Sequence, residues 1–263
     1  MRTAEELKNI VKEKYGDIAE KSSSCCSGCG CDEEKDYSIL AEDYATLEGY
    51  NPEADLQLGC GIPTQYAQIK KGDTVVDLGS GAGNDCFVAR ALTGASGKVI
   101  GLDFTERMVE KAKVNAAKLG FTNIEFILGE IEDIPIPDNT ADVVVSNCVM
   151  NLVPDKEKAF LETYRILKKG GHFSISDIVL QGELPAGLRD DAAMYAGCVA
   201  GALQKEEYLD IVRKAGFRNL IIQVQKQLDL DEEIYLKYFT EDEMEVFRRS
   251  SNGIYSITLN AEK

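Results

Sequence analysis

The sequence predicts an α/β fold, with a mostly parallel sheet, helices on both faces and a C-terminal extension. From Gly72 onward, short apolar runs that contain β-branched residues alternate with segments of helical periodicity. Strands that alternate with helices of roughly ten to fifteen residues form βαβ units, which place parallel strands in one sheet. The chain has 263 residues, 44% of them hydrophobic, so it is long enough to bury a large core.

Each element follows from its local pattern. The apolar runs predict strands over 74–79, 98–103, 124–129, 141–147 and 172–180. Apolar residues at helical spacing predict helices over 84–94, 106–120 and 155–171, the last ending at a double glycine. A turn-rich link over 181–191 then precedes predicted helices over 191–203 and 205–217 and late strands over 219–230 and 253–263.

The patterns divide the chain into three parts. Residues 1–40 combine a short amphipathic helix with the run SSSCCSGCGC, which is typical of a flexible tail. Residues 41–180 are expected to form the cofactor-binding domain. Residues 181–263 are too short for us to assign them a core of their own, so we expect them to extend the same sheet.

Charge and composition exclude several function classes. The sequence holds 29 Lys and Arg against 45 Asp and Glu, a net charge of −16, so nucleic acid and anionic membranes are not expected as partners. No apolar run approaches the roughly 20 residues that span a bilayer, and the charged N-terminal segment does not resemble a signal peptide. We therefore expect a cytoplasmic protein. The single histidine, His172, excludes a multi-histidine metal centre and is expected at the surface.

A glycine-rich loop follows the first predicted strand. DLGSGAG, from Asp77 to Gly83, stands between a strand and a helix, the context that a nucleotide-binding loop requires. Its spacing is GxGxG, and Asn84 occupies the place of the third glycine in a dinucleotide-binding loop. Asp77 precedes the first glycine by two positions, an acidic approach that favours a cationic ligand over a diphosphate.

Acidic residues also follow the next two strands. Asp103 ends the second strand, where a carboxylate can accept hydrogen bonds from both hydroxyls of a ribose. Glu130 and Ile131 follow the third strand, where a carboxylate can accept from an adenine amine while a backbone amide meets a ring nitrogen.

Over roughly residues 65–180, this order of motifs resembles the class I S-adenosylmethionine (SAM)-dependent methyltransferases. The resemblance implies a Rossmann-like sheet and SAM as the cofactor. It places cofactor positions at Asp77, Gly79, Ser80, Gly81, Gly83, Asp103, Phe104, Glu130, Ile131, Glu132 and Asn147. Either Glu130 or Glu132 would be the residue that meets the adenine.

Three of the eight cysteines stand in distinctive surroundings. Cys60 lies between two glycines, which we expect to leave its thiol uncovered. Cys148 directly follows the fourth strand, at the edge where open α/β sheets bind ligands, and Cys198 lies among small residues. Only the fold could bring these thiols together. If it does, a three-thiolate site suits a soft, thiophilic ion and does not resemble catalytic zinc.

The blocks LGCGIP, DLGSGAGNDC, GEIEDIP, SNCVMNLVPDK and YAGCVAGA occur in this order. Over roughly residues 37–217 the chain is similar to the arsenite methyltransferases. The resemblance implies that Cys60, Cys148 and Cys198 bind As(III) and act in catalysis. It also implies that the arsenic lone pair takes the methyl group of SAM, giving methylated arsenicals in arsenic detoxification. Thioredoxin or glutathione would be the reductant.

The other cysteines are less informative. Cys86, on the predicted helix after the glycine loop, is expected in the core. Cys25, Cys26, Cys29 and Cys31 have CxxC-like spacing without a second pair, which supports a zinc knuckle only weakly. Redox partnering, arsenic capture and tail thiols without a defined role remain alternatives.

Two further functions stay open from the residues alone. The first is a methyltransferase for a carbon or oxygen nucleophile on another small molecule, with Glu53, Asp55 or Asp177 as a candidate base. The second is a thiol-based protein on a methyltransferase fold that binds arsenic or a heavy metal. The intact cofactor motifs argue against the second, and cofactor affinity would distinguish it from the enzymes.

Overall fold

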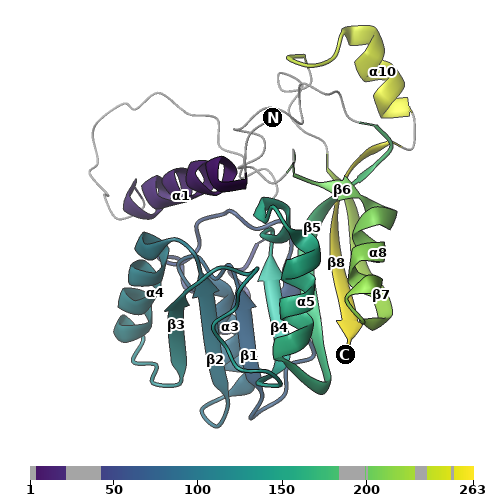
Figure 1. Ribbon diagram of the computed structural model, residues 1–263. Helices are drawn as coiled ribbons and strands as arrows, with labels where there is room; N and C mark the ends of the chain where they lie inside the picture. The colour runs from purple at the N-terminus through teal and green to yellow at the C-terminus, as the bar shows by residue number, and fades with distance from the viewer. Residues whose placement is uncertain (1–3, 22–42, 184–198, 200, 229–235, 250–251) are drawn as a thin grey trace.

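One sheet of eight strands organises the protein (Figure 1). The computed structural model describes residues 4–21, 43–183, 199, 201–228, 236–249 and 252–263. The strand order is β3-β2-β1-β4-β5-β8-β7, with β6 beside β5. The strands are β1 (Thr74–Leu78), β2 (Lys98–Asp103), β3 (Ile124–Leu128), β4 (Ala141–Asn147), β5 (Leu167–Gln181), β6 (Leu203–Gln204), β7 (Arg218–Leu228) and β8 (Gly253–Glu262).

The sheet is mostly parallel, as predicted. Strands β1 to β5 pair in parallel, and β6 pairs in parallel with β5. Strand β8 is antiparallel to both β5 and β7. Every strand predicted from the sequence is confirmed, and the two late strands belong to the same sheet as the first five.

Helices cover both faces of the sheet, which also confirms the prediction. The helices are α1 (Ala4–Lys21), α2 (Pro63–Tyr66), α3 (Asn84–Thr93), α4 (Glu106–Lys118), the 3-10 turn η2 (Met150–Leu152), α5 (Lys156–Ile166), α8 (Lys205–Lys214) and α10 (Glu241–Arg249). Helices α5 and α8 pack on one face, and α2, α3 and α4 pack on the other. Successive side chains of a strand point to opposite faces of the sheet. In β1, Val75 therefore packs in the core under α3, and Val76 packs in the core under α5.

Some boundaries differ from the prediction. Helix α5 ends at Ile166 instead of at the double glycine, because Leu167 already pairs with Ala141 of β4. The helix predicted over 191–203 lies mostly outside the described residues, and its last residue, Leu203, is in β6. His172 is partly buried instead of exposed, and its Nε2 lies 2.6 Å from the carbonyl oxygen of Ala67.

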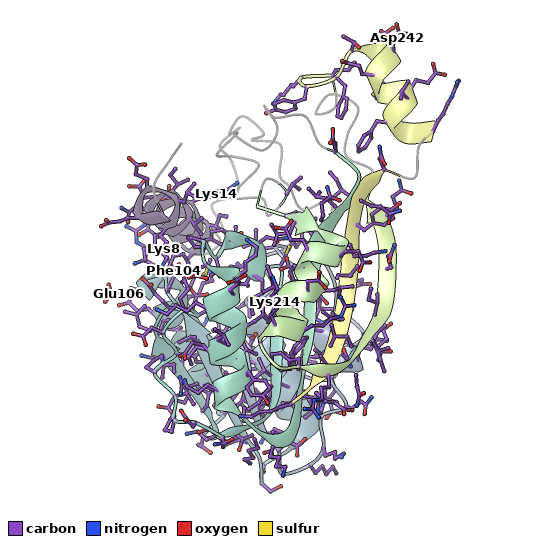
Figure 2. The ribbon with its side chains drawn as sticks, turned by 45° about the vertical axis from the view of Figure 1, so that its right-hand side comes forward. Lys8, Lys14, Phe104, Glu106, Lys214 and Asp242 are labelled. Atoms are coloured by element: carbon purple, nitrogen blue, oxygen red, sulfur yellow. The ribbon has the colours of Figure 1, made fainter. Side chains whose placement is uncertain are left out.

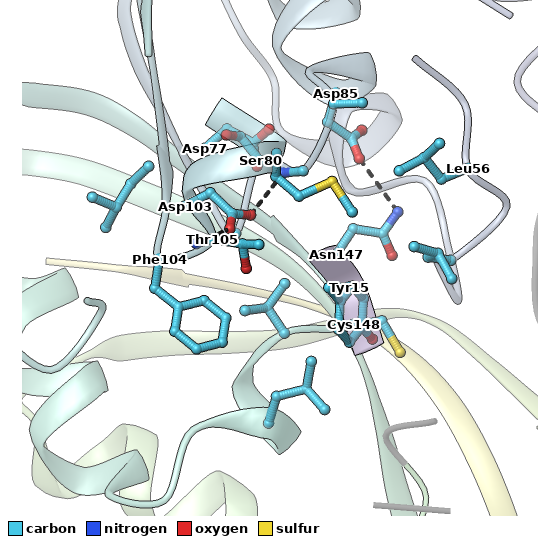
Figure 3. Close-up of a pocket in the computed structure, with 18 of the residues that line it drawn as sticks. Tyr15, Leu56, Asp77, Ser80, Asp85, Asp103, Phe104, Thr105, Asn147 and Cys148 are labelled. Atoms are coloured by element: carbon cyan, nitrogen blue, oxygen red, sulfur yellow. Dashed lines mark hydrogen bonds between the residues drawn. The ribbon is translucent and has the colours of Figure 1, made fainter. Parts of the chain in front are cut away.

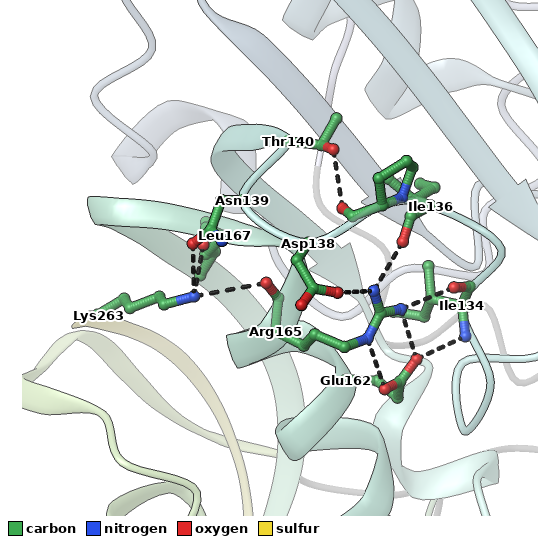
Figure 4. Close-up of polar contacts among 10 residues, drawn as sticks. Ile134, Ile136, Asp138, Asn139, Thr140, Glu162, Arg165, Leu167 and Lys263 are labelled. Atoms are coloured by element: carbon green, nitrogen blue, oxygen red, sulfur yellow. Dashed lines mark hydrogen bonds and ion pairs between the residues drawn. The ribbon is translucent and has the colours of Figure 1, made fainter.

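A cluster of charged side chains lies near the start of β4 (Figure 4). The Arg165 guanidinium donates to the carboxylates of Glu162 and Asp138, at 2.7–2.8 Å, and to the carbonyl oxygens of Ile134 and Ile136, both at 2.8 Å. The hydrogen bond from Arg165 lowers the pKa of Glu162. The cluster thereby fixes the connection between β3 and β4.

None of the helices in the described ranges is long and apolar enough to cross a membrane.

Candidate active site

A cavity opens at the carboxyl ends of the parallel strands. In the sheet, β2 lies on one side of β1 and β4 on the other, so the strand order reverses at β1. The cavity lies at this reversal, the position at which open α/β sheets bind ligands. It encloses about 1170 Å³, including its opening to solvent. Its walls come from α1, the segment before α2, the glycine loop and the ends of β2, β3 and β4 (Figure 3).

The cavity brings together most of the cofactor residues expected from the sequence. Gly83 does not line it. A Cβ atom on Gly83 would lie 2.9 Å from the rings of Phe87 and Phe126, so this glycine lets the loop pack closely on the core. The predicted residues that line the cavity are Asp77, Gly79, Ser80, Gly81, Asp103, Phe104, Glu130, Ile131, Glu132 and Asn147.

The glycine loop presents open backbone to the cavity. Gly79 and Gly81 have positive φ angles of 72° and 51°, which side chains other than glycine rarely adopt. A Cβ on Gly79 would lie 2.4 Å from Val149, whereas a Cβ on Gly81 would meet nothing within 4 Å. The loop is therefore tightly packed at its first glycine and leaves room for a ligand at its second.

Three buried carboxylates surround this loop. Asp77 is 2% exposed, and Asp85 and Asp103 are each 8% exposed. Burial raises the pKa of all three carboxyls, the pKa of Asp85 to about 6, and repulsion from Asp85 adds to the rise at Asp77. Among the described residues, no Lys, Arg or His side chain pairs with them. The cavity is therefore suited to a ligand that carries positive charge.

The donors to these carboxylates are uncharged. The Cys86 thiol donates to Asp77 at 3.2 Å, the Tyr44 hydroxyl donates to Asp85 at 2.9 Å, and the Gly81 amide donates to Asp103 at 2.9 Å. Cys86 is fully buried in the core, as predicted. These bonds orient the three side chains but bring no positive charge to them.

The hydroxyls of two other lining residues, Ser80 and Thr105, are shielded from the cavity. Ser80 Oγ lies against Gly101 of β2, where an added Cβ would be 2.8 Å from it. The polar contacts of a ligand are therefore left to the open backbone at Gly81 and the carboxylate of Asp103. These groups fit the sugar and cationic groups of SAM.

Helix α1 forms one wall of the cavity, a role that the sequence pattern does not reveal. Lys8, Val11 and Tyr15, spaced on one helical face, line the cavity. Lys8 Nζ lies 2.7 Å from Glu130 and 3.1 Å from Glu132, so one lysine holds both candidate adenine-binding acids. Lys8 and Phe104, which both line the cavity, are labelled in Figure 2.

Two of the three predicted arsenic-binding cysteines are buried beside the cavity. Cys60 is 2% and Cys148 4% exposed, and both belong to one buried cluster. Cys148 lines the cavity and has a positive φ of 59°, a rare backbone geometry for a residue other than glycine. Its amide donates to the carbonyl oxygen of Ser176 at 2.7 Å, which anchors the strained residue to β5.

The expectation that Cys60 is uncovered was wrong. The flanking glycines serve close packing instead of exposure. A Cβ on Gly59 would lie 2.5 Å from Asn147 Nδ2, and a Cβ on Gly61 would lie 2.6 Å from Ser176 Oγ. The backbone on either side of Cys60 thus lies directly against Asn147 at the end of β4 and Ser176 within β5.

Cys198 lies outside the described residues, as do Cys25, Cys26, Cys29 and Cys31. Val199, the next residue after Cys198, is 1% exposed and belongs to the same buried cluster as Cys60 and Cys148. Within the described ranges, no three His, Cys, Asp or Glu residues form a metal-binding group.

The alternative catalytic bases lie in different places. Glu53 pairs with Lys118 at 2.6 Å on the surface. Asp177 is fully buried outside the cavity lining, and the Tyr208 hydroxyl donates to it at 3.2 Å. Of the three candidates, only Asp55 lines the cavity, and it accepts a 3.2 Å hydrogen bond from Tyr50.

Sequence reasoning missed Tyr44 and Asp85 as site residues. Asp85 stands in the first turn of α3, two residues after the last glycine of the loop, and that position was its only signal. Tyr44 lies in an irregular segment with no periodic pattern. Both line the cavity and are bonded to each other.

The comparisons with known proteins agree with this geometry. A family model described as "Methyltransferase domain" matches residues 69–216. The chain is 40% identical over 228 residues to an arsenite methyltransferase of Halobacterium salinarum, covering 82% of this chain and 58% of the relative. It is 35% identical over 225 residues to the human arsenite methyltransferase, covering 81% of this chain and 58% of the relative. The chain thus spans about three fifths of the length of these curated relatives.

A solved structure gives the same result. The crystal structure of an arsenic (III) S-adenosylmethionine methyltransferase from Chlamydomonas reinhardtii matches with a TM-score of 0.66 and 35% identity. The match covers 78% of this chain and 67% of that one. The chain therefore belongs to the methyltransferase domain family and, within it, to the family of the arsenite methyltransferases.

Proposed function

We propose that this protein is an arsenite methyltransferase that binds SAM in the acidic cavity and methylates As(III) held by Cys60, Cys148 and Cys198. One observation carries the proposal. Cys148 lines the same cavity as buried carboxylates that have no cationic partner among the described residues. A cation site and a soft nucleophile site are therefore adjacent, as the transfer of a methyl group from a sulfonium to arsenic requires.

The residues of the cavity would hold SAM as follows. Asp103 accepts the ribose hydroxyls, and the open backbone at Gly81 leaves room for the ligand beside it. Asp77 and Asp85 face the positively charged part of the ligand. Glu130 or Glu132, with the amide of Ile131, meets the adenine. When bound, SAM supplies an electrophilic methyl group on a sulfonium.

Arsenic is the substrate. Three thiolates hold As(III) in a pyramid that keeps a lone pair on arsenic, and this lone pair is the nucleophile for the methyl group. The thiolates raise the electron density on arsenic, so no general base is needed. Catalysis then rests on alignment, for which effective molarities of about 10⁵ M or more are available. The motif that surrounds Cys198 and the burial of Val199 beside Cys60 and Cys148 support the third ligand.

A reductant is part of the proposal. Methyl transfer formally oxidises arsenic from the trivalent to the pentavalent state, so two electrons must return before another methyl group is accepted. Protein thiols supply them by forming a disulfide, which a thioredoxin or glutathione system reduces. The proposal places the reaction in the cytoplasm, where thiols stay reduced.

The test is incubation of the full chain with arsenite, a thiol and methyl-labelled SAM, followed by speciation of the arsenic products. We expect labelled methylarsenicals from the wild type. We expect at least a 100-fold lower rate from Cys148→Ser and Cys60→Ser, with unchanged SAM affinity. Cys148→Ser at the wild-type rate would contradict the arsenic assignment. A folded protein that binds no SAM at millimolar concentration would instead be a thiol-based carrier.

A further inference from the structure

The turn that follows Cys148 is tied to strand β5 by hydrogen bonds. The Cys148 amide donates to the carbonyl oxygen of Ser176 at 2.7 Å. Three residues later, Asn151 of η2 donates from its side-chain amide to the carbonyl oxygen of Ile178 at 2.6 Å. Asp177 lies between these two acceptors in β5, so its own contacts bear on the same turn.

The carboxylate of Asp177 supplies a further tie. Asp177 and Asn151 are both fully buried. Burial raises the pKa of Asp177 to about 7, although hydrogen bonds from the backbone amides of Ile178 and Asn151 favour the carboxylate. The main chain and the side chain of Asn151 are therefore both held by β5.

A buried tyrosine of α8 orients this carboxylate. The Tyr208 hydroxyl donates to Asp177 Oδ2 at 3.2 Å, while the Ile178 amide donates to Oδ1 at 2.9 Å. Burial and the charge of Asp177 raise the pKa of Tyr208, and repulsion from Cys60 and Cys148 adds to the rise. The hydroxyl of Tyr208 thus lies within electrostatic reach of both thiols.

The backbone of Cys148 requires such support. Its φ of 59° is unfavourable for a residue other than glycine, and a conformation of this kind persists only where the surroundings hold it. The next residue, Val149, packs against the glycine loop, since a Cβ on Gly79 would lie 2.4 Å from it. The place of the Cys148 thiol and one wall of the cavity both depend on where this turn lies.

We propose that Asp177 and Asn151 are positioning residues for methyl transfer, which hold Cys148 in its left-handed conformation and present its thiol to the cavity. Tyr208 keeps the Asp177 carboxylate in the orientation that accepts hydrogen bonds from the turn. None of these three residues lines the cavity, so they act through Cys148 and not by contact with a ligand. The inference rests on the proposed function in taking Cys148 as an arsenic ligand.

The first measurement needs no arsenic. The alkylation rate of Cys148 by iodoacetamide is followed in the full, ligand-free chain at pH 8 by peptide mass spectrometry. Cys86, fully buried in the core, reports global unfolding in the same digest. In Asp177→Ala the turn loses its carboxylate tie, and we expect Cys148 to be alkylated at least tenfold faster. The Cys86 rate should stay within twofold of the wild type.

The second measurement compares two ligands. Equilibrium dialysis with elemental mass spectrometry gives the arsenite affinity, and calorimetric titration gives the affinity for S-adenosylhomocysteine. We expect Asp177→Ala to weaken arsenite binding at least tenfold and to leave S-adenosylhomocysteine binding within threefold. Asp177→Asn keeps an oxygen that accepts from the backbone amides and an amino group that donates to Tyr208. It should therefore restore arsenite affinity to within threefold of the wild type.

Further variants separate positioning from a loss of stability. Asn151→Ala should weaken arsenite binding about fivefold. Since Asn151 and Asp177 hold the same turn, the double variant should lose less than the product of the single losses. Thr93→Val is the matched control. It removes a buried 2.7 Å hydrogen bond to the carbonyl oxygen of Asp73, at the opposite end of β1 from the cavity, and should leave arsenite affinity and Cys148 alkylation within twofold.

Several outcomes would overturn the proposal. Wild-type alkylation of Cys148 in both Asp177→Ala and Asn151→Ala would do so. Equal losses in Asp177→Asn and Asp177→Ala would also do so, because they would assign the effect to the negative charge instead of to positioning. A parallel rise of the Cys86 and Cys148 rates would show general destabilisation and would reject the proposal as well.

Tyr208→Phe removes one hydroxyl, keeps the ring and covers the case in which Asp177→Ala does not fold. We expect about threefold faster alkylation of Cys148 in this variant, and an unchanged rate would count against the proposal. The two hypotheses fail in different ways. A folded wild type that binds no arsenite would reject the proposed function, whereas the alkylation rates would still decide whether Asp177 and Asn151 hold Cys148.

Discussion

Two polar clusters at opposite ends of the sheet use carboxylates in different ways. At the start of β4, Asp138 and Glu162 both pair with Arg165, at 2.7 Å each (Figure 4). At the carboxyl ends of β1 and β2, the hydrogen-bond donors to Asp77 and Asp103 within the described residues are backbone amides and a thiol (Figure 3). The pKa of Glu162 is therefore lowered, whereas burial raises the pKa of Asp77 and Asp103.

The carboxylates of the two clusters differ in role. A carboxylate that is paired within the chain stabilises the fold and has little charge left for a ligand. Buried carboxylates with no cationic partner disfavour their own ionisation, which the fold tolerates at sites where a ligand supplies the missing charge. The cavity is such a site, and the Arg165 cluster is not.

The largest effect that would test this contrast is expected at Asp103. Asp103→Asn removes a charged acceptor from the cavity, and we expect the affinity for S-adenosylhomocysteine to fall about 100-fold, the loss of two charge-assisted hydrogen bonds. Asp138→Asn makes the same chemical change in the Arg165 cluster. For it we expect an affinity within twofold of the wild type in calorimetric titration. Similar losses in both variants would erase the distinction.

The two clusters should also differ in how stability depends on pH. The pKa of Asp85 is raised to about 6, so its contribution is fully present below its unfolded value and is lost as the pH rises through 6. The pKa of Glu162 is lowered, so its contribution is present above its unfolded value and is lost as the pH falls.

Urea unfolding of the ligand-free protein between pH 4 and 7 measures this difference. Relative to the wild type, Asp85→Asn should gain stability as the pH rises, by about 2 kcal/mol over the range. Glu162→Gln should change in the opposite sense and lose relative stability. Parallel trends for the two variants would show that the carboxylates are not in opposite electrostatic surroundings.

The smallest effect concerns the wall formed by α1. Lys8→Met removes the ion pairs with Glu130 and Glu132, and we expect cofactor affinity to fall about threefold at low salt, because partly exposed ion pairs contribute little. Lys98→Met removes a comparable pair with Glu125, on a residue outside the cavity lining, and should leave affinity unchanged. Equal affinities for Lys8→Met and the wild type would argue against a binding role for α1.

Local patterns predicted most of the fold because strands and helices differ in period. The β-branched run over 74–79 and the helical spacing over 84–94 correspond to β1 and α3. The end of α5 was missed because pairing of Leu167 with β4 overrides the helix preference of the following lysines. Strand pairing is a long-range property, and no local pattern shows it.

The sequence predicted those parts of the candidate site that belong to a motif with a fixed place in the fold. The glycine loop and Asp103 indicated the cavity because both follow parallel strands, whose carboxyl ends meet at one edge. Tyr44 and the packing face of α1 depend on contacts far along the chain and have no comparable motif. The glycines beside Cys60 suggested exposure, although their role is close approach to Asn147 and Ser176.

The central claim is that a cationic ligand supplies the charge that the cavity acids lack. Calorimetric titration of SAM at pH 6 in two buffers of different ionisation enthalpy tests it most directly. Since the pKa of Asp85 is about 6 before binding, Asp85 is about half protonated at pH 6, and a cation that lowers its pKa should release up to about half a proton from it. The release should be smaller in Asp85→Asn. Proton uptake, or no proton exchange, on SAM binding to the wild type at pH 6 would contradict the account.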